Sequence, residues 1–477
     1  MPSKTADRGR ARGPSPPAVG PALTTAFTVS WAVAILFDKA YYHHWAWSPT
    51  NFGLAAACGL MLVTPRSSRA LLVLATAQIA DWFSDQSILG NHPIILAMAN
   101  ATLLLAAARR GWSSTWQDDD AGAVLTSAAP AIRLGVLIVY AWATIHKLNT
   151  DFLSLDHSCV TFLVTDLRNR PLPMAFLPVE SSWLQAGIHG TLVVESLIPL
   201  LLAFRKTRGA GVLLGVCFHS FLSSGPRNGF FAFAVVIFPL LWLFASEQAM
   251  TRLGAVFRRV VGTRIDVSPA TFVRGAALLG IALASLASAH LEINRTYPAW
   301  ITYNAIVLVW AVSEAWSGVR AVGDCRQGLL RCGDPVLVVM PLLFVFNGAC
   351  PYLGLKTETS FSMYSNLRTE GGLSNHLFLT ADIAPFGFQK DLVEIIDSSD
   401  PGLREVARSG KALPWFELRR RAWIDPSMSV TFVRRGEMFV VESIRDSPDI
   451  VPPESWWLWR LMPFRTVERN GPRRCDH

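Results

Sequence analysis

The stretch AWATIHKLNTDF, Ala141–Phe152, decides how this chain is interpreted, because it closes an apolar segment with a polar cluster. The preceding residues predict a membrane-spanning helix over 131–149 that ends at His146 and Lys147. A lysine in this place can extend its ammonium into the lipid headgroups and carry no further role. Alternatively, an amine held partly desolvated at the mouth of a cavity can act as a base. Both interpretations are open for Lys147 at this point.

The composition is that of a membrane protein. Of 477 residues, 51% are hydrophobic and only 16% are charged, whereas soluble proteins carry roughly 25% charged residues. Apolar runs that approach about 20 residues, the length that crosses a bilayer, recur along the chain. We expect an all-α polytopic bundle of about eleven spans. They are predicted at 21–38, 52–64, 70–84, 93–108, 131–149, 183–204, 209–223, 229–246, 271–290, 300–316 and 335–352.

The basic residues set the expected orientation of the chain. The net charge is +8, but lysines and arginines gather in short clusters between apolar segments, as topology signals do. Basic and aromatic residues are not interleaved as they are in proteins that bind nucleic acid, so no nucleic-acid partner is expected. The clusters place the N-terminus in the cytoplasm, and an odd number of spans then places the C-terminus on the extracytoplasmic side.

Three regions follow from these patterns. Residues 1–20, rich in Pro, Gly and Arg, are expected to form a disordered cytoplasmic arm. Residues 21–352 form the transmembrane domain, and residues 353–477 form a small exported α+β cap. Within the cap, VEIID (393–397) and PWFELRRRAWID (414–425) are expected to be strands, PGLREVARSG (401–410) a helix, and SVTFVRRGEMFVVESI (429–444) a hairpin.

The seven cysteines predict neither a metal site nor a disulfide. They include no CxxC pair and no matching pair of histidines. We therefore expect no bound metal and assign no cysteine pairing.

Other polar residues lie within or at the ends of the predicted spans. Asn91 and His92 precede the span 93–108, and His189 lies in the span 183–204. An acid inside a membrane helix is costly and usually faces a cavity or a partner, so Glu195 is a candidate site residue. A single histidine such as His219 is more often a hydrogen-bonded packing residue.

Three motifs in order carry a resemblance to a known family. They are HKLNTDF (146–152), HGTLVVESLIPLLLAF (189–204) and FHSFLSSGPRNGFF (218–231). Together they resemble the membrane core of the horizontally transferred transmembrane domain (HTTM) family, which is related to the vitamin K-dependent gamma-carboxylases. The resemblance covers about residues 131–246.

The resemblance implies a membrane enzyme of the lyase class that uses a reduced quinone and oxygen at an outward-facing site. It implies quinol epoxidation, with or without coupled carboxylation, and a co-substrate such as vitamin K hydroquinone or menaquinol. Lys147 matches the family's base, with Glu195 and His219 as further catalytic groups. The quinol-binding residues would be Asn91, His92, His146, Asn149, His189 and Arg227.

Two departures from the family's pattern concern the base. His146 stands where the family has the first lysine of a pair, and Asn149 stands where it has an acid; either change could retune the base or mark its loss. A phenolic hydroquinone has a pKa near that of tyrosine, about 10. A lysine amine accepts such a proton near neutral pH only where burial lowers the pKa of that amine.

Two other functions are compatible with the sequence. One is a non-catalytic membrane scaffold or lipid/quinone-binding protein, in which the cluster around Lys147 is solvated. The other is a transporter with Glu195 and His219 as a proton relay, although the polar residues favour the outer half of the spans. The expected partners are the lipid bilayer, the quinol and an unidentified acceptor.

Overall fold

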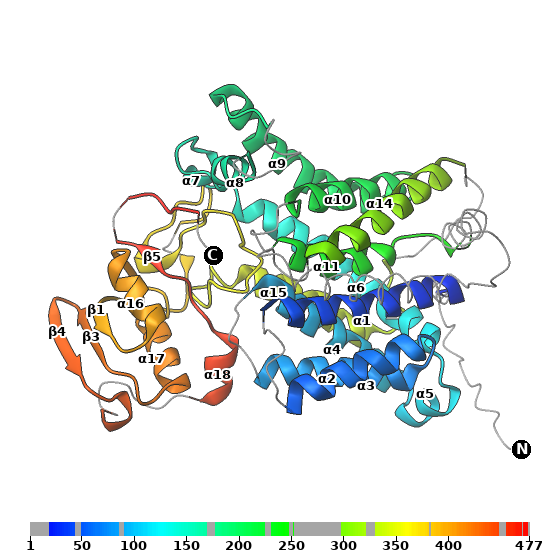
Figure 1. Cartoon of the computed structure of the whole chain (residues 1–477), viewed down its shortest axis with the longest axis horizontal. Coiled ribbons are helices and arrows are strands. Elements are labelled where there is room, and N and C mark those ends of the chain that lie inside the picture. Colours follow the sequence, from blue (N-terminus) through cyan, green and yellow to red (C-terminus); the bar gives the residue numbers. More distant parts are fainter. Residues whose placement is uncertain are drawn as a thin grey trace, which may run out of the picture.

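A helical part and a smaller cap make up the structure (Figure 1). The computed structural model describes residues 19–42, 49–84, 90–168, 177–224, 230–247, 251, 297–320, 330–380, 383–447, 455–469 and 471–475. The predicted arm before residue 19 and the predicted span 271–290 lie outside these residues.

Among the described residues, four helices are long and apolar enough to cross a membrane, which identifies a membrane protein. They are α1 (Pro21–Tyr42), α4 (Asn91–Arg110), α6 (Ala121–His146) and α9 (Ser181–Ala203). Shorter apolar helices are α2 (Pro49–Val63), α10 (Arg208–Leu222), α11 (Phe230–Trp242) and α15 (Val339–Ala349) with the 3₁₀ turn η2 (Pro335–Val338) before it. In α14 (Tyr297–Arg320) the apolar segment is Trp300–Ala315. The remaining helices of this part are α3 (Ser68–Ser84), α5 (Trp112–Asp118), α7 (Thr150–Leu153) and α8 (Cys159–Arg168). The predicted number of eleven spans is not confirmed.

Helix α6 begins ten residues earlier than the predicted span 131–149. Asp120 caps its first turn, because its side chain accepts a hydrogen bond from the amide of Gly122. Farther along, the buried Arg133 donates from Nε to the carbonyl of Leu243 over 2.7 Å. That carbonyl lies just beyond the end of α11, where it has no partner within the helix. The helix ends with Lys147 as its C-cap.

The cap contains one five-stranded antiparallel sheet in the order β4-β3-β1-β2-β5. Its strands are β1 (Leu392–Ser398), β2 (Lys411–Pro414), β3 (Val430–Arg434), β4 (Glu437–Val441) and β5 (Val467–Glu468). The predicted hairpin is confirmed as β3 and β4, joined through Arg435 and Gly436 with positive φ at both, as tight hairpin turns require. The predicted helix at 401–410 is confirmed as α16 (Pro401–Arg408). Two further short helices are η5 (Ile444–Asp446) and α18 (Trp456–Leu461).

The prediction of a strand over 414–425 is wrong. Strand β2 ends at Pro414, and residues Trp415–Ile424 form helix α17. The buried Glu417 binds Arg420 at 2.8 Å and Arg421 at 3.1 Å. Positions three and four residues apart share a helix face, whereas in a strand Glu417 and Arg420 would point to opposite sides.

Residues 356–380, here called the cap loop, fasten the cap to the helical part; they include the short turn η3 (Glu370–Gly372). The amide of Thr150 donates to the carbonyl of Asn375, and the amide of Leu377 donates to that of Leu148, so the loop lies on the end of α6. Four of its non-glycine residues have positive φ: Thr359, Phe361, Tyr364 and Asn366. L-residues adopt this conformation at a cost, and such strain persists where the surroundings fix the backbone.

A disulfide joins Cys159, the first residue of α8, to Cys475 near the C-terminus, 316 residues away. The expectation that no cysteine pairing could be assigned is therefore corrected. Cysteines so far apart leave no spacing pattern, and only the fold brings their Cα atoms to 4.9 Å.

Candidate functional site

An apolar cavity of about 340 Å³ lies among helices α6, α7, α8, α9, α10 and α11. Its wall is mainly aliphatic and aromatic, with a small number of polar side chains. Met363 and Tyr364 of the cap loop complete the wall from outside the helices. A concave apolar site with few polar groups is typical of a small-molecule pocket.

Helical periodicity explains which residues reach the cavity. From α6 they include Tyr140, Ala143 and Lys147, at positions i, i+3 and i+7. From α9 they are Gly187, Gly190, Thr191, Val194 and Glu195. Residues with this spacing share one helix face, so each helix presents one stripe to the cavity.

Lys147 and Glu195 form a buried ion pair in the cavity wall. Nζ of Lys147 lies 2.9 Å from Oε2 of Glu195, and the two side chains are only 5% and 10% exposed. The same Nζ donates to the carbonyl of Ala143 over 3.3 Å and lies 5.9 Å from the ring centroid of Phe152. The interpretation of Lys147 as a lysine reaching into headgroups does not fit this geometry, because its ammonium is held against a carboxylate inside the protein.

His219 and Tyr140 form a second polar pair in the same wall. The phenol oxygen of Tyr140 lies 2.8 Å from Nε2 of His219, and both residues are buried. Phe218 and Phe233 contact the imidazole with ring centroids at 5.3 Å. The structure thus brings Lys147, Glu195 and His219 to one cavity. Tyr140 was missed in the sequence, although its position seven residues before Lys147 puts both on one face.

His146 and Asn149 are buried beside Lys147 but do not line the cavity. Nδ1 of His146 lies 2.9 Å from the hydroxyl of Tyr352, and its Nε2 lies 3.0 Å from the carbonyl of Ser360. Asn149 caps α7 and donates from Nδ2 to the carbonyl of Ser365. Both residues hold the segment that follows α15 against the end of α6.

The other four predicted ligand residues also lie away from the cavity or outside the described residues. Nε2 of His92 lies 2.8 Å from Oδ1 of Asp38, and Asn91 accepts a hydrogen bond from the amide of Phe361. His189 is exposed on α9 and lies 2.9 Å from Gln185. Arg227 falls in the gap at 225–229.

Three further residues of the wall were not among the site residues predicted from the sequence: Cys159, Met363 and Tyr364. Tyr364 stacks on Phe230 of α11 with ring centroids 4.1 Å apart. All three also border a second, polar pocket on the cap side. They therefore form a partition between the two spaces.

Residues 35–247 match the family model of the HTTM domain, which confirms the resemblance seen in the three motifs. The match begins within α1, ends after α11 and includes the helices α6 to α11 that line the cavity. It reaches well before residue 131, where the motif-based resemblance began. No curated protein and no solved structure matches the chain.

Proposed function

We propose that this HTTM-domain membrane protein binds a reduced quinone in the apolar cavity and uses it together with oxygen. The observation that carries the proposal is the buried Lys147–Glu195 pair in a wall that is otherwise mostly apolar. The relation of the HTTM domain to the gamma-carboxylases supplies the reaction class.

The cavity suits a quinol in size and polarity. Its volume of about 340 Å³ falls within the roughly 300–1,000 Å³ of small-molecule sites. The aliphatic and aromatic lining fits a substituted ring and an isoprenoid chain. The polar groups of Lys147, Glu195, Tyr140 and His219 fit the ring oxygens, because hydroxyl groups buried without hydrogen bonds are costly.

The ion pair has the proton capacity that the reaction needs. When Lys147 is an ammonium and Glu195 is a carboxylate, the pair can still take up one more proton, on the carboxylate. The pair can therefore accept a phenolic proton, and a positive charge then remains beside the phenolate oxygen. Because Nζ of Lys147 and Oε2 of Glu195 lie only 2.9 Å apart, we treat the two residues together as the proton acceptor.

In the net reaction, quinol and O₂ give quinone epoxide and water. The quinol supplies all four electrons that O₂ takes up, two as it becomes a quinone and two as its ring double bond becomes an epoxide. The chain contributes the proton acceptor, and its aromatic residues Phe218 and Phe233 cover the His219 side of the wall. Exclusion of water strengthens the electrostatic effect of the pair. An organic acceptor and carbon dioxide would extend the reaction to carboxylation.

The proposed orientation has the N-terminus in the cytoplasm and the cap outside. The distribution of basic residues supports it. The Cys159–Cys475 disulfide supports it independently, because such bonds persist in oxidising compartments and are rare in the cytosol. The cavity then opens toward the extracytoplasmic side of the bilayer.

A quinol turnover assay tests the proposal. The full chain in lipid nanodiscs is given menaquinol and oxygen, and epoxide is measured by mass spectrometry. We expect epoxide from the native chain and a loss of at least about 100-fold in Lys147→Ala, the scale of general acid–base catalysis. Lys390→Ala, which removes an exposed lysine of the cap, is the matched control. Absence of epoxide from folded protein with menaquinol and with vitamin K hydroquinone would contradict catalysis.

A second candidate is quinone binding without turnover. It is favoured by His146 and Asn149, which occupy the family's lysine and acid positions but here hold the cap segment. Binding of menaquinone in the same nanodiscs, followed by quenching of tryptophan fluorescence, distinguishes the two functions. Binding without epoxide would support this candidate.

A further inference from the structure

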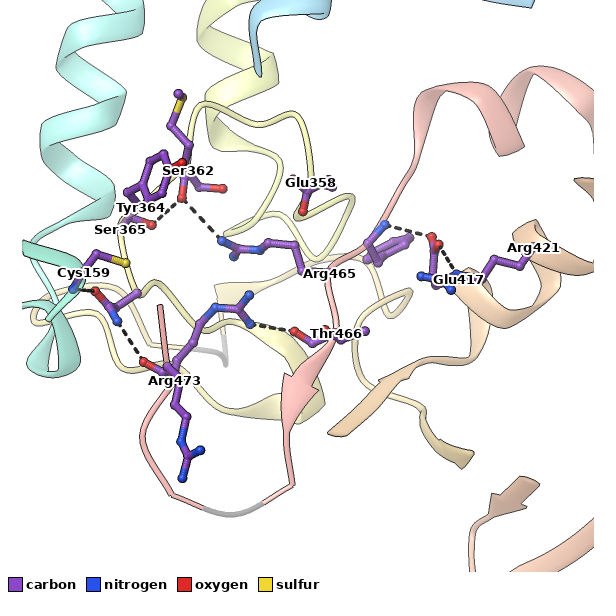
Figure 2. Close-up of a pocket in the computed structure, with 14 residues that line it drawn as sticks. Cys159, Glu358, Ser362, Tyr364, Ser365, Glu417, Arg421, Arg465, Thr466 and Arg473 are labelled. Atoms are coloured by element: carbon purple, nitrogen blue, oxygen red, sulfur yellow. Dashed lines mark hydrogen bonds and ion pairs between the residues drawn. The ribbon is translucent and has the colours of Figure 1, made fainter. Parts of the chain in front are cut away.

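A polar pocket of about 190 Å³ lies on the cap side of the partition, between the cap loop, α17 and the C-terminal segment 464–474 (Figure 2). It shares Cys159, Met363 and Tyr364 with the apolar cavity. The rest of its lining is more polar than that of the apolar cavity, because most of these residues have charged or hydroxyl-bearing side chains. The quinol proposal makes no use of this pocket.

Positive charge is in excess around the pocket. Four guanidinium groups line it, those of Arg421, Arg465, Arg473 and Arg474, against the two carboxyl groups of Glu358 and Glu417. Glu417 is engaged within its own helix by Arg420 at 2.8 Å and by Arg421 at 3.1 Å. This leaves Arg465, Arg473 and Arg474 as the positive groups of the lining, against Glu358. The lining therefore has the charge to attract a doubly negative group.

Two of the guanidinium groups are held in place by backbone carbonyls. Arg465 donates from Nη2 to the carbonyl of Leu367 over 3.0 Å, and its Nε lies 3.7 Å from Glu370. Arg473 donates from Nη1 to the carbonyl of Thr466 over 2.9 Å (Figure 2). A carbonyl orients a guanidinium without cancelling its charge. Both guanidinium groups therefore keep their positive charge at the pocket wall, where it attracts an anion.

Glu358 repels an anion less than a fully ionised carboxylate would. Its carboxyl group is directed toward Arg465 in Figure 2. Burial raises the pKa of Glu358 to about 7, although Arg465 and Arg473 oppose the shift. Near neutral pH a substantial fraction of this carboxyl is therefore protonated, and the protonated form donates a hydrogen bond instead of repelling an anion.

We propose that the polar pocket binds a dianionic oxyanion of the phosphate type, with Arg465, Arg473 and Arg474 as its ligands. Planar guanidinium forks match the oxygens of such a group in pairs. The group belongs either to a soluble phosphorylated ligand or to an anionic lipid headgroup, since both present the same chemistry. The assignment is independent of what occupies the apolar cavity.

Binding of sulfate and inorganic phosphate tests the proposal. The full chain is placed in nanodiscs of zwitterionic lipid, and each anion is titrated calorimetrically at mildly acidic pH and constant ionic strength. Sulfate stays dianionic throughout, so its binding reports the pocket alone. We expect saturable binding of one anion per chain, and weaker binding of the monoanion acetate.

The variants localise the site. Arg474→Gln removes an exposed guanidinium at the mouth and should weaken sulfate binding about 5- to 10-fold, the loss of one charge-assisted hydrogen bond. Arg465→Gln should weaken it further where the variant folds. Arg469→Gln is the matched control, because Arg469 pairs with Glu394 and does not line the pocket. Non-saturable binding, an equal loss in Arg469→Gln, or acetate binding as tightly as sulfate would overturn the proposal.

A second arm identifies the source of the anion. In nanodiscs containing phosphatidic acid, a lipid headgroup in the pocket would compete with sulfate. The apparent dissociation constant of sulfate would then rise in the native chain. It would rise much less in Arg474→Gln. Unchanged sulfate binding in these discs would assign the pocket to a soluble phosphorylated ligand. Either result supports an oxyanion site and specifies its ligand.

Discussion

Tyr364 of the cap loop stacks on Phe230 of α11 with ring centroids 4.1 Å apart. Phe230 lies within the residues matched by the HTTM domain, and Tyr364 lies more than 100 residues beyond them. The apolar cavity is therefore completed by a segment that lies outside the residues matched by the family model. The backbone of Tyr364 has a φ of 51°, so the surroundings hold this residue in a conformation that it would not adopt freely.

Tyr364→Ala should weaken menaquinone binding about tenfold. The substitution removes one aromatic wall of the cavity and its contact with Phe230, and aromatic pairs contribute about 0.5–1.5 kcal/mol beyond burial. Phe378→Ala is the control, because Phe378 lies in the same loop but is 74% exposed and outside the cavity. Quenching of tryptophan fluorescence by menaquinone in nanodiscs measures the affinity of each variant. Unchanged affinity in Tyr364→Ala would show that the cap loop does not belong to the site.

The Lys147–Glu195 pair should behave as one unit in folding. Lys147→Met or Glu195→Leu alone leaves a buried charge without its partner, which costs roughly 3–5 kcal/mol. The double variant replaces both charges with apolar groups and should be considerably more stable than the sum of the single effects predicts. Thermal unfolding of the native chain, the two single variants and the double variant in one detergent gives the coupling free energy between the two side chains. Additive losses would mean that the two groups do not interact.

Glu358 should make the cap less stable as the pH rises. Its pKa is about 7 in the folded protein against 4.5 ordinarily, mainly because of burial. The folded state therefore favours the protonated form, and the resulting stabilisation is complete below pH 4.5 and disappears as the pH rises to about 7.

Glu358→Gln removes this ionisation and should gain stability relative to the native chain over the same interval, by up to about 3 kcal/mol. Unfolding midpoints of the two proteins are compared at pH 5 and at pH 7.5. Glu370 provides the contrast. Burial raises its pKa, but Arg465 and Arg473 outweigh that effect and hold the pKa below its usual value. Glu370→Gln should therefore destabilise at the higher pH. A Glu358→Gln variant with no pH-dependent gain would contradict the assignment.

Loss of the Cys159–Cys475 disulfide should destabilise the cap. A native disulfide typically contributes about 2–4 kcal/mol, and this one ties the C-terminal segment to α8 next to both pockets. Cys475→Ser should lower the unfolding temperature and weaken sulfate binding, because Arg473 and Arg474 lie directly before the bond. Cys217→Ser, which changes an exposed free cysteine, is the control. Peptide mapping without reductant that finds Cys159 unpaired would remove the basis of this prediction.

Local patterns in the sequence predicted several elements of the fold and part of the site. Glu195 was identified because an acid in an apolar helix is rarely left without a partner, and the hairpin because alternating residues flank Arg435–Gly436. The assignment of 414–425 to a strand failed because aromatic residues favour strands, while the ion pair between Glu417 and Arg420 stabilises a helix. The roles of His146 and Asn149 also escaped the sequence, since their partners lie in the segment that follows α15.

The sequence by itself determined that this is a membrane protein, that residues 35–247 match the HTTM domain, and that Lys147 ends a membrane helix. These properties depend on apolar content, helical period and short motifs, all of which are local. Only the tertiary structure decided that Lys147 faces Glu195, that Tyr364 closes the cavity and that Cys159 meets Cys475 across 316 residues. Contacts between distant segments depend on how helices pack and where a loop returns, and no local pattern encodes that arrangement.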